Sequence, residues 1–115
     1  MYTKMGFNGL YFWRIDYQDK INRLANNTCE MVWDPTAGTG SPSGIFTHVL
    51  YHNYGWPAGY CFDVRCSDDP IMDDPRLENY NADWKAAGLV SYLHERASHY
   101  NTNELLVTIG GDFNY

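Results

Sequence analysis

The feature that most constrains the fold of this chain is the apolar run Leu105–Ile109, which stands directly before Gly110-Gly111-Asp112. A strand that is apolar on both faces is typical of the centre of a parallel sheet, because helices cover both sides of such a sheet. A parallel sheet also needs neighbouring strands and crossover connections. The run therefore predicts an α/β fold with a central parallel strand at residues 105–109.

The rest of the chain supplies the other expected elements. Short apolar runs predict strands at residues 8–13, 30–33 and 45–51, although the last run also fits a turn of helix. Apolar residues at helical spacing predict helices over residues 16–24 and 79–100. The longer helix carries one apolar stripe, formed by Ala82, Ala86, Leu89, Leu93, Ala97 and Tyr100. The alternation of strands and helices indicates an α/β class with no internal domain boundary.

Two polar residues follow predicted strands, where α/β folds place their chemistry. Arg14 comes after the run that ends at Trp13, and Asp112 comes after residues 105–109. Desolvation behind a buried strand raises the pKa of a carboxyl group, and a raised pKa suits a general acid. A Gly-Gly-Asp turn is also common as a structural element, so the spacing alone leaves both interpretations open.

Charge and hydrophobicity exclude several classes of protein. The chain has 14 acidic and 8 basic residues, a net charge of −6 and no cluster of Lys and Arg, which argues against a nucleic-acid partner. It has no apolar stretch of about 18 residues, so we expect no membrane span, and its first residues show no signal peptide. A hydrophobic content of 44% argues against disorder.

The cysteines lie in two places. Cys61 and Cys66 form a C-x4-C pair within the irregular region 52–79 and fit a disulfide, two free thiols or half of a zinc site. Cys29 is left over, either as a buried thiol or with a partner outside this chain. Asn26-Asn27-Thr28 is a glycosylation sequon at Asn26, and together with a disulfide it favours the secretory pathway.

Other polar and aromatic residues give weaker signals. The four histidines and the Asp-Pro pairs of residues 68–75 complete no recognised metal pattern, so we expect no metal ligand in this chain. Aromatic residues surround the irregular region, and they fit either stacking on sugar faces or plain packing. They are Trp33, Tyr51, Tyr54, Trp56 and Tyr60.

Residues 5–20 resemble the segment that follows the nucleophile motif in family 38 α-mannosidases, with the R-x-D-Y-Q-D-K pattern of the lysosomal branch at Arg14–Lys20. The similarity continues in the same order along nearly the whole chain. The further matching positions are Ile45–Thr47, Tyr54 with Pro57, Cys61–Cys66, Asp74–Arg76, Tyr80-Asn81, Tyr100–Asn103 and Gly111–Tyr115.

This resemblance implies a fold, an activity and a location. The family's catalytic domain is a distorted, seven-stranded parallel α/β barrel-like fold, of which residues 1–115 would be a fragment. The complete enzymes are zinc-dependent retaining exo-α-mannosidases that act on N-glycan-type oligosaccharides, using a nucleophile and an acid/base carboxylate. Zinc orients the mannose hydroxyls. The lysosomal branch implies the lysosome or the secretory pathway.

The resemblance also assigns roles to residues of this chain. Asp112 falls on the general acid/base, Arg14 on an arginine beside the nucleophile and Tyr54 on an aromatic residue of the sugar pocket. Cys61 and Cys66 match a disulfide pair of lysosomal members. The family's nucleophile and zinc ligands match no residue of this chain. We therefore expect an internal slice of the catalytic domain, with Met1 an internal methionine, that is inactive by itself. The alternative is a non-catalytic mannose-binding or interaction module derived from that fold.

Overall fold

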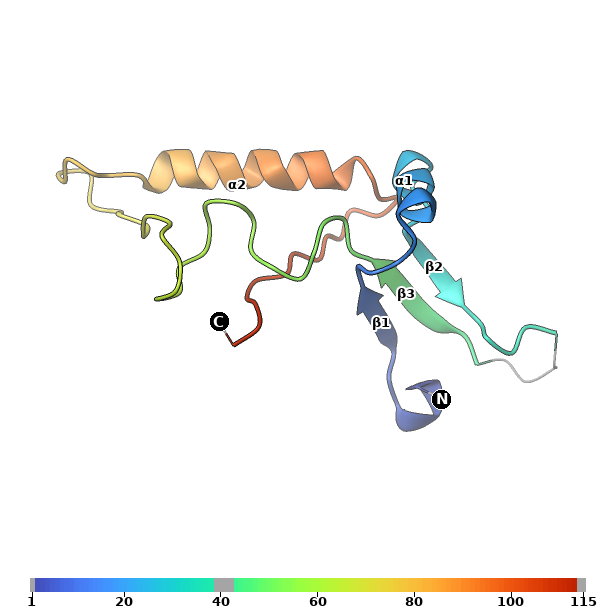
Figure 1. The fold of residues 1–115 in the computed structure, drawn as a ribbon. Helices are drawn as coiled ribbons and strands as arrows, with labels where there is room; N and C mark the ends of the chain where they lie inside the picture. The colour runs from blue at the N-terminus through green and yellow to red at the C-terminus, as the bar shows by residue number, and fades with distance from the viewer. Residues whose placement is uncertain (1, 39–42, 114–115) are drawn as a thin grey trace.

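The structure of the chain is a computed structural model that describes residues 2–38 and 43–113. It contains a short 3-10 helix, three strands and two α-helices, arranged as a small sheet with one long helix extending away from it (Figure 1). In chain order they are η1 (Tyr2–Met5), β1 (Gly9–Phe12), α1 (Tyr17–Ala25), β2 (Glu30–Trp33), β3 (Ile45–Val49) and α2 (Ala82–Ala97).

The sheet has the strand order β1-β3-β2, with β3 in the centre. β3 runs parallel to β1 and antiparallel to β2, so that both Leu10 and Met31 lie opposite Thr47. The α/β class is confirmed, but the expectation of a parallel sheet is wrong for β2. The described parts of the connection from β2 to β3, residues 34–38 and 43–44, contain no helix, and a parallel return needs a crossover of a dozen or more residues. The seven-stranded barrel stays a prediction.

The predicted central strand at residues 105–109 is also wrong within the described chain. These residues form no helix or strand and pair with none of the three strands, and Ile109 is 68% exposed. The central strand of the sheet is β3, and its two edges are already paired, one with β1 and the other with β2. A strand requires a partner backbone, so an apolar run alone does not form one. We call residues 103–113 the return segment, because they run back beneath α2 (Figure 1).

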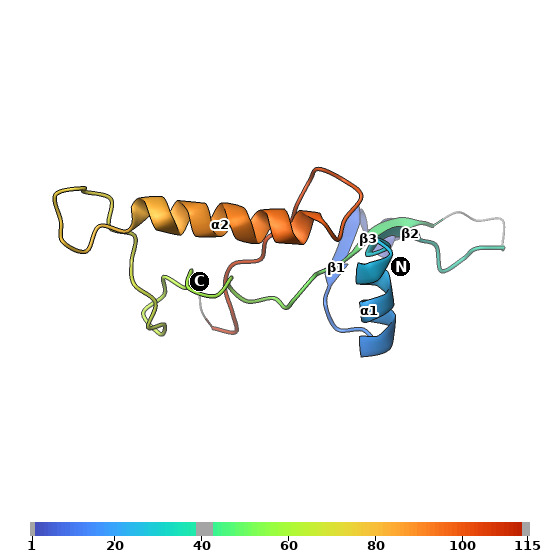
Figure 2. The same cartoon turned by 90° about the horizontal axis from the view of Figure 1, so that it is seen from above.

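The core lies at the sheet. Cys29, Val49 and Tyr100 are buried together, and Phe12 and Leu24 pack against them. The remaining partly buried neighbours are Ile15, Met31, Tyr51 and Leu105. α1 begins at an N-cap, Asp16, whose carboxylate accepts hydrogen bonds from the backbone N–H groups of residues 18 and 19. α1 lies beside the sheet (Figure 2), and its residue Leu24 packs against the core.

α2 is a regular helix that packs little. Its only buried residue is Lys85. The face turned toward the rest of the chain carries Lys85, Gly88, Tyr92 and Arg96, next to the predicted apolar stripe rather than on it. The radius of gyration is 18.2 Å, against about 13 Å for a compact domain of this length. The chain is therefore elongated. Within the described residues, no helix is both long and apolar enough to cross a bilayer.

Candidate active site

Arg14 and Tyr54 meet at the edge where the two parallel strands end. β1 ends at Phe12 and β3 at Val49, so the chain leaves both strands on the same side of the sheet. The backbone N–H of Trp13 donates a 3.3 Å hydrogen bond to the Tyr54 hydroxyl, and the two rings meet edge to face at 5.9 Å. The Arg14 guanidinium lies 5.0 Å from the centre of the Trp13 ring. Trp13 thus joins two of the three predicted site residues.

Lys20 adds a second cation to this edge. Its Nζ donates to the carbonyl oxygens of Trp13 (3.4 Å) and His52 (3.3 Å), and it lies 5.3 Å from the Trp13 ring centre. Partial burial lowers the pKa of the Lys20 ammonium. Sequence patterns alone give neither Trp13 nor Lys20 a role at the site. One signal was available, since Lys20 lies in the first turn of a helix that begins directly after β1.

Asp112 lies in the return segment. The residues just before it, rather than its own side chain, contact the region around Tyr54. Gly110 is buried, and its carbonyl oxygen lies 3.8 Å from the place that a Cβ on Gly55 would occupy. The backbone just before Asp112 therefore runs against the turn that carries Tyr54. The Asp112 side chain itself is exposed. The expected desolvation behind a buried strand is not found in the described chain, because residues 105–109 form no strand that could cover it.

The turn that carries Tyr54, residues 53–55, is ordered locally. The side-chain oxygen of Asn53 accepts a 2.7 Å hydrogen bond from the backbone N–H of Gly55, the pattern of an Asx turn. The return segment contacts this turn through Thr108, whose hydroxyl lies within hydrogen-bond distance of the carbonyl oxygens of residues 53 and 55. We call residues 53–55 the Tyr54 turn.

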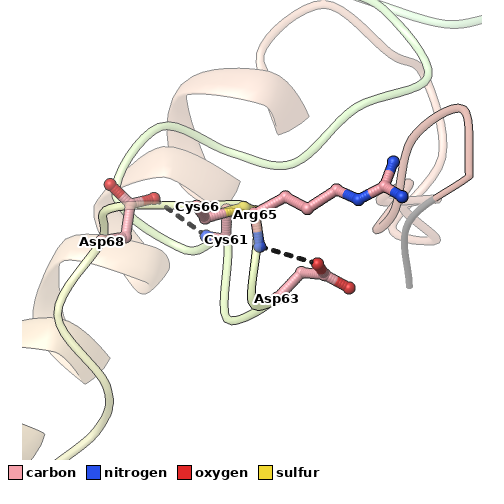
Figure 3. The surroundings of a disulfide bond; sticks show 5 residues. All are labelled: Cys61, Asp63, Arg65, Cys66 and Asp68. Carbon is pink, nitrogen blue, oxygen red and sulfur yellow. Dashed lines mark hydrogen bonds between the residues drawn. A yellow bond between two sulfur atoms is a disulfide. The ribbon is translucent and has the colours of Figure 1, made fainter.

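Cys61 and Cys66 are joined in a disulfide, with their Cα atoms 5.8 Å apart (Figure 3). Of the three interpretations of the C-x4-C pair, the structure confirms the disulfide. The small loop is further held by hydrogen bonds from the Cys61 N–H to Asp68 (3.0 Å) and from the Arg65 N–H to Asp63 (3.0 Å). Cys29 is a free, buried thiol whose pKa is raised by burial.

A cavity of about 530 Å³ lies between α2, the loop after β3 and the return segment. Neither Arg14, Tyr54 nor Asp112 lines it. Six of its lining residues are aromatic, namely Tyr51, Trp56, Tyr60, Trp84, Tyr92 and Tyr100. Lys85 also lines it, is only 4% exposed, and donates a 2.8 Å hydrogen bond from Nζ to the carbonyl oxygen of Gly59.

Two other predictions concern a modification and a metal. Asn26, the sequon asparagine, is exposed at the C-terminal cap of α1, and its Nδ2 donates to the Asn22 carbonyl oxygen at 2.8 Å. Glycosylation there stays a prediction.

Among residues 2–38 and 43–113, no three His, Cys, Asp or Glu side chains gather where they could hold a metal ion. The described residues therefore do not fit a zinc site, and zinc stays a prediction for the larger protein.

Comparison with known proteins decides the family. The sequence pattern of the glycosyl hydrolases family 38 N-terminal domain matches residues 1–115. The chain belongs to glycosyl hydrolase family 38. It is 44% identical over 120 residues to the lysosomal alpha-mannosidase of Cavia porcellus and 36% identical over 116 residues to that of Homo sapiens. The Dictyostelium discoideum lysosomal alpha-mannosidase is 38% identical over 115 residues.

These family 38 matches cover 100% of this chain but only 11–12% of each relative. The resemblance to family 38 α-mannosidases is thereby confirmed. The roles of Asp112, Arg14 and Tyr54 remain predictions. The structure adds how the three residues are placed relative to one another. Two of these residues meet at Trp13, and the backbone before the third contacts the Tyr54 turn.

Proposed function

We propose that this chain is part of the catalytic domain of a lysosomal-type α-mannosidase that removes terminal α-mannose from N-glycan-type oligosaccharides by a retaining mechanism. The observation that carries the proposal is the family 38 match along residues 1–115. The convergence of Arg14 and the Tyr54 turn with the return segment supports it, because a glycosidase needs its sugar-binding groups and its acid close together.

Asp112 is the proposed general acid/base. It protonates the leaving glycosidic oxygen in the first step and takes a proton from water in the second. Its exposed position leaves the carboxyl group accessible to a substrate. Arg14 supplies fixed N–H donors for sugar or carboxylate oxygens, and the ring of Tyr54 offers a face for the sugar. The Trp13 contacts fix the distance between these two binding groups.

Zinc, which the family resemblance implies, would need ligands from elsewhere in the larger protein. The same resemblance places the nucleophile outside the matched positions. A retaining hydrolysis needs both carboxylates. We therefore expect the isolated 115-residue chain to show no turnover of an aryl α-mannoside. Detectable turnover would contradict the proposal that the nucleophile and the zinc ligands lie outside this chain.

The proposed location is the lysosome or the secretory pathway. The Cys61–Cys66 disulfide supports an oxidising compartment. Asn26 is the proposed site of an N-linked glycan, since its side chain lies on the surface. Expression in a secretory host should give a mass that falls on treatment with an N-glycosidase. The Asn26→Gln variant should lack that glycan, and an unchanged glycan count in this variant would exclude the site.

The test of the catalytic proposal is Asp112→Asn in the full-length mannosidase, with the exposed Asp69→Asn as the matched control. Loss of a general acid lowers the rate about 10²–10⁴-fold where the leaving oxygen needs protonation. We expect that loss in kcat/KM, which reports the first step, on an alkyl or oligosaccharide mannoside, and a much smaller loss in kcat/KM on a dinitrophenyl mannoside. Asp69→Asn should resemble the wild type. Equal losses of Asp112→Asn on both substrates would contradict the role.

The alternative, a non-catalytic glycan-binding module, is favoured by one observation, the aromatic cavity beside α2. Aromatic side chains present apolar faces that suit the apolar face of a sugar. Titration of the 115-residue chain with methyl α-mannoside, followed by tryptophan fluorescence, tests this function. Saturable binding that is lost in Trp56→Ala but kept in Asp112→Asn would favour the module over the enzyme fragment.

A further inference from the structure

We propose that Thr108 is a positioning residue of the family 38 site. Its hydroxyl fixes the Tyr54 turn relative to the return segment that carries Asp112. This inference rests on the proposed function, because it concerns the relative placement of the proposed sugar-binding tyrosine and the proposed acid. In the sequence, Thr108 stands out only as part of an apolar run.

The hydrogen-bond geometry singles out this hydroxyl. Thr108 Oγ1 lies 3.1 Å from the carbonyl oxygen of Asn53 and 3.3 Å from that of Gly55. These two carbonyl groups flank Tyr54 on either side. A threonine hydroxyl has a single proton, so it is shared between the two acceptors. One side chain from the return segment therefore holds the backbone both before and after Tyr54.

The Tyr54 turn has its other restraints from elsewhere. The Asn53 side chain orders the turn internally, and the Trp13 N–H holds the Tyr54 hydroxyl at 3.3 Å. Neither bond involves the return segment. Thr108 is thus the polar side-chain link, within the described residues, between this turn and the segment that leads to Asp112.

The path from Thr108 to Asp112 is short. Only residues 109–111 separate them, and Gly110 is buried with a φ of 126°, a conformation that favours glycine. The carbonyl oxygen of Gly110 already faces Gly55. Because only three residues separate them and the middle one is buried against the Tyr54 turn, a shift of Thr108 along the turn would move the chain that leads to Asp112.

The position of Thr108 explains why a side chain is needed for this purpose. Residues 105–109 form no ladder with β1, β2 or β3, so backbone pairing with these strands does not set their register relative to the Tyr54 turn. Thr108 is half-buried and lines the cavity beside α2, where competing water is partly excluded. A hydrogen bond in such a place holds two segments better than one on the open surface.

The variants that test this are Thr108→Val, which keeps the shape and removes the hydroxyl, and Thr108→Ser, which keeps the hydroxyl. In the full-length mannosidase we expect Thr108→Val to lower kcat/KM on an alkyl α-mannoside about tenfold to a hundredfold, since small misplacements of a reacting group have effects of that order. The loss should be smaller on a dinitrophenyl mannoside, which needs little acid assistance. Thr108→Ser should restore most of the rate.

Amide hydrogen exchange gives a readout that does not depend on turnover. Thr108→Val should speed exchange in residues 53–56 and 110–113 together, and Thr108→Ser should not. If Thr108→Val does not fold, Thr108→Ala takes its place. Unchanged exchange in the variant without a hydroxyl, or equal rate losses on both substrates, would overturn the inference. If the wild type has no mannosidase activity, the proposed function fails, and the exchange result alone decides whether Thr108 joins the two segments.

Discussion

The two ends of this elongated chain are held together in different ways. The sheet end, which we define as residues 9–33, 45–50 and 98–102, contains most of the buried apolar side chains, namely Cys29, Ile45, Val49, Leu50 and Tyr100. The helix end, residues 52–97, contains the longest helix, yet that helix buries only a lysine. The length and regularity of α2 therefore do not by themselves show that it packs against a core.

Polar links take the place of a core at the helix end. The Lys85 ammonium donates to the Gly59 carbonyl, and the Tyr60 hydroxyl donates to the Lys85 carbonyl at 2.7 Å. Asn81 joins the start of α2 to the preceding loop through Pro70 and Met72. At the sheet end, ladder hydrogen bonds surround buried apolar groups instead. The same kind of substitution should therefore have different effects at the two ends.

Valine truncation gives the largest expected contrast. Val49 is fully buried and Val90 is 52% exposed. Val49→Ala should lower the free energy of local opening of the strands by about 2 kcal/mol, from lost transfer energy and a residual cavity. Val90→Ala, the matched control, should change it by less than about 0.5 kcal/mol. Native-state hydrogen exchange measures both, and equal effects would mean that the two ends pack alike.

Removal of the disulfide should affect the helix end alone. In the chain-entropy description, closing so short a loop stabilises by about 2 kcal/mol. The double variant Cys61→Ser and Cys66→Ser should therefore exchange faster in residues 57–68. The amides of β3 should be unaffected, because no part of the sheet depends on this loop. Faster exchange throughout the sheet in the same variant would show that the two ends are coupled.

A glycine in α2 tests the polar link through Tyr60. A Cβ on Gly88 would come within 2.7 Å of the Tyr60 hydroxyl oxygen. Gly88→Ala should therefore displace Tyr60 and offset the usual gain of about 1 kcal/mol from replacing a helical glycine. In a Tyr60→Phe background the same substitution should recover that gain. Circular dichroism measures the helix stability of the wild type, the two single variants and the double variant. Identical effects of Gly88→Ala in both backgrounds would show that Tyr60 does not restrict this position.

The smallest expected effect concerns the pH dependence of Cys29. Burial raises its pKa above the ordinary value of 9.0, so its contribution to the stability of the sheet end is complete below that pH and is lost as the pH rises further. Native Cys29 should also resist alkylation at pH 8 and react after unfolding. A Cys29→Ala control should lack this alkaline effect. Rapid alkylation in the native state would show that the core around Cys29 is open.

The sequence predicts local elements of this chain better than it predicts their partners. The helices around residues 16–24 and 79–100 are found at nearly the expected places, because spacing and capping act within a few residues. The pairing expected of residues 105–109 is wrong, because an apolar run does not state which backbone lies beside it. The direction of β2 differs for a related reason, since it depends on the connection after Trp33 rather than on the strand itself.

The candidate site shows the same difference between single residues, which the sequence indicates, and their contacts, which it does not. Arg14 and Tyr54 can be named from motif positions, and parallel pairing of β1 with β3 explains why they meet. Trp13, Lys20 and Thr108 emerge only when three separate segments are brought together. The expected burial of Asp112 depends on a strand that the described chain does not form. Single positions can thus be predicted from sequence, whereas contacts between distant segments cannot.

The central claim, that Asp112 is the acid/base of a retaining mannosidase, is tested most directly by azide rescue of Asp112→Ala in the full-length protein. With a dinitrophenyl mannoside, azide needs no base to attack the glycosyl-enzyme intermediate. We predict faster turnover with azide and an α-mannosyl azide product, the retained configuration. Absence of any azide effect on rate or product, or a β-configured azide, would contradict the claim.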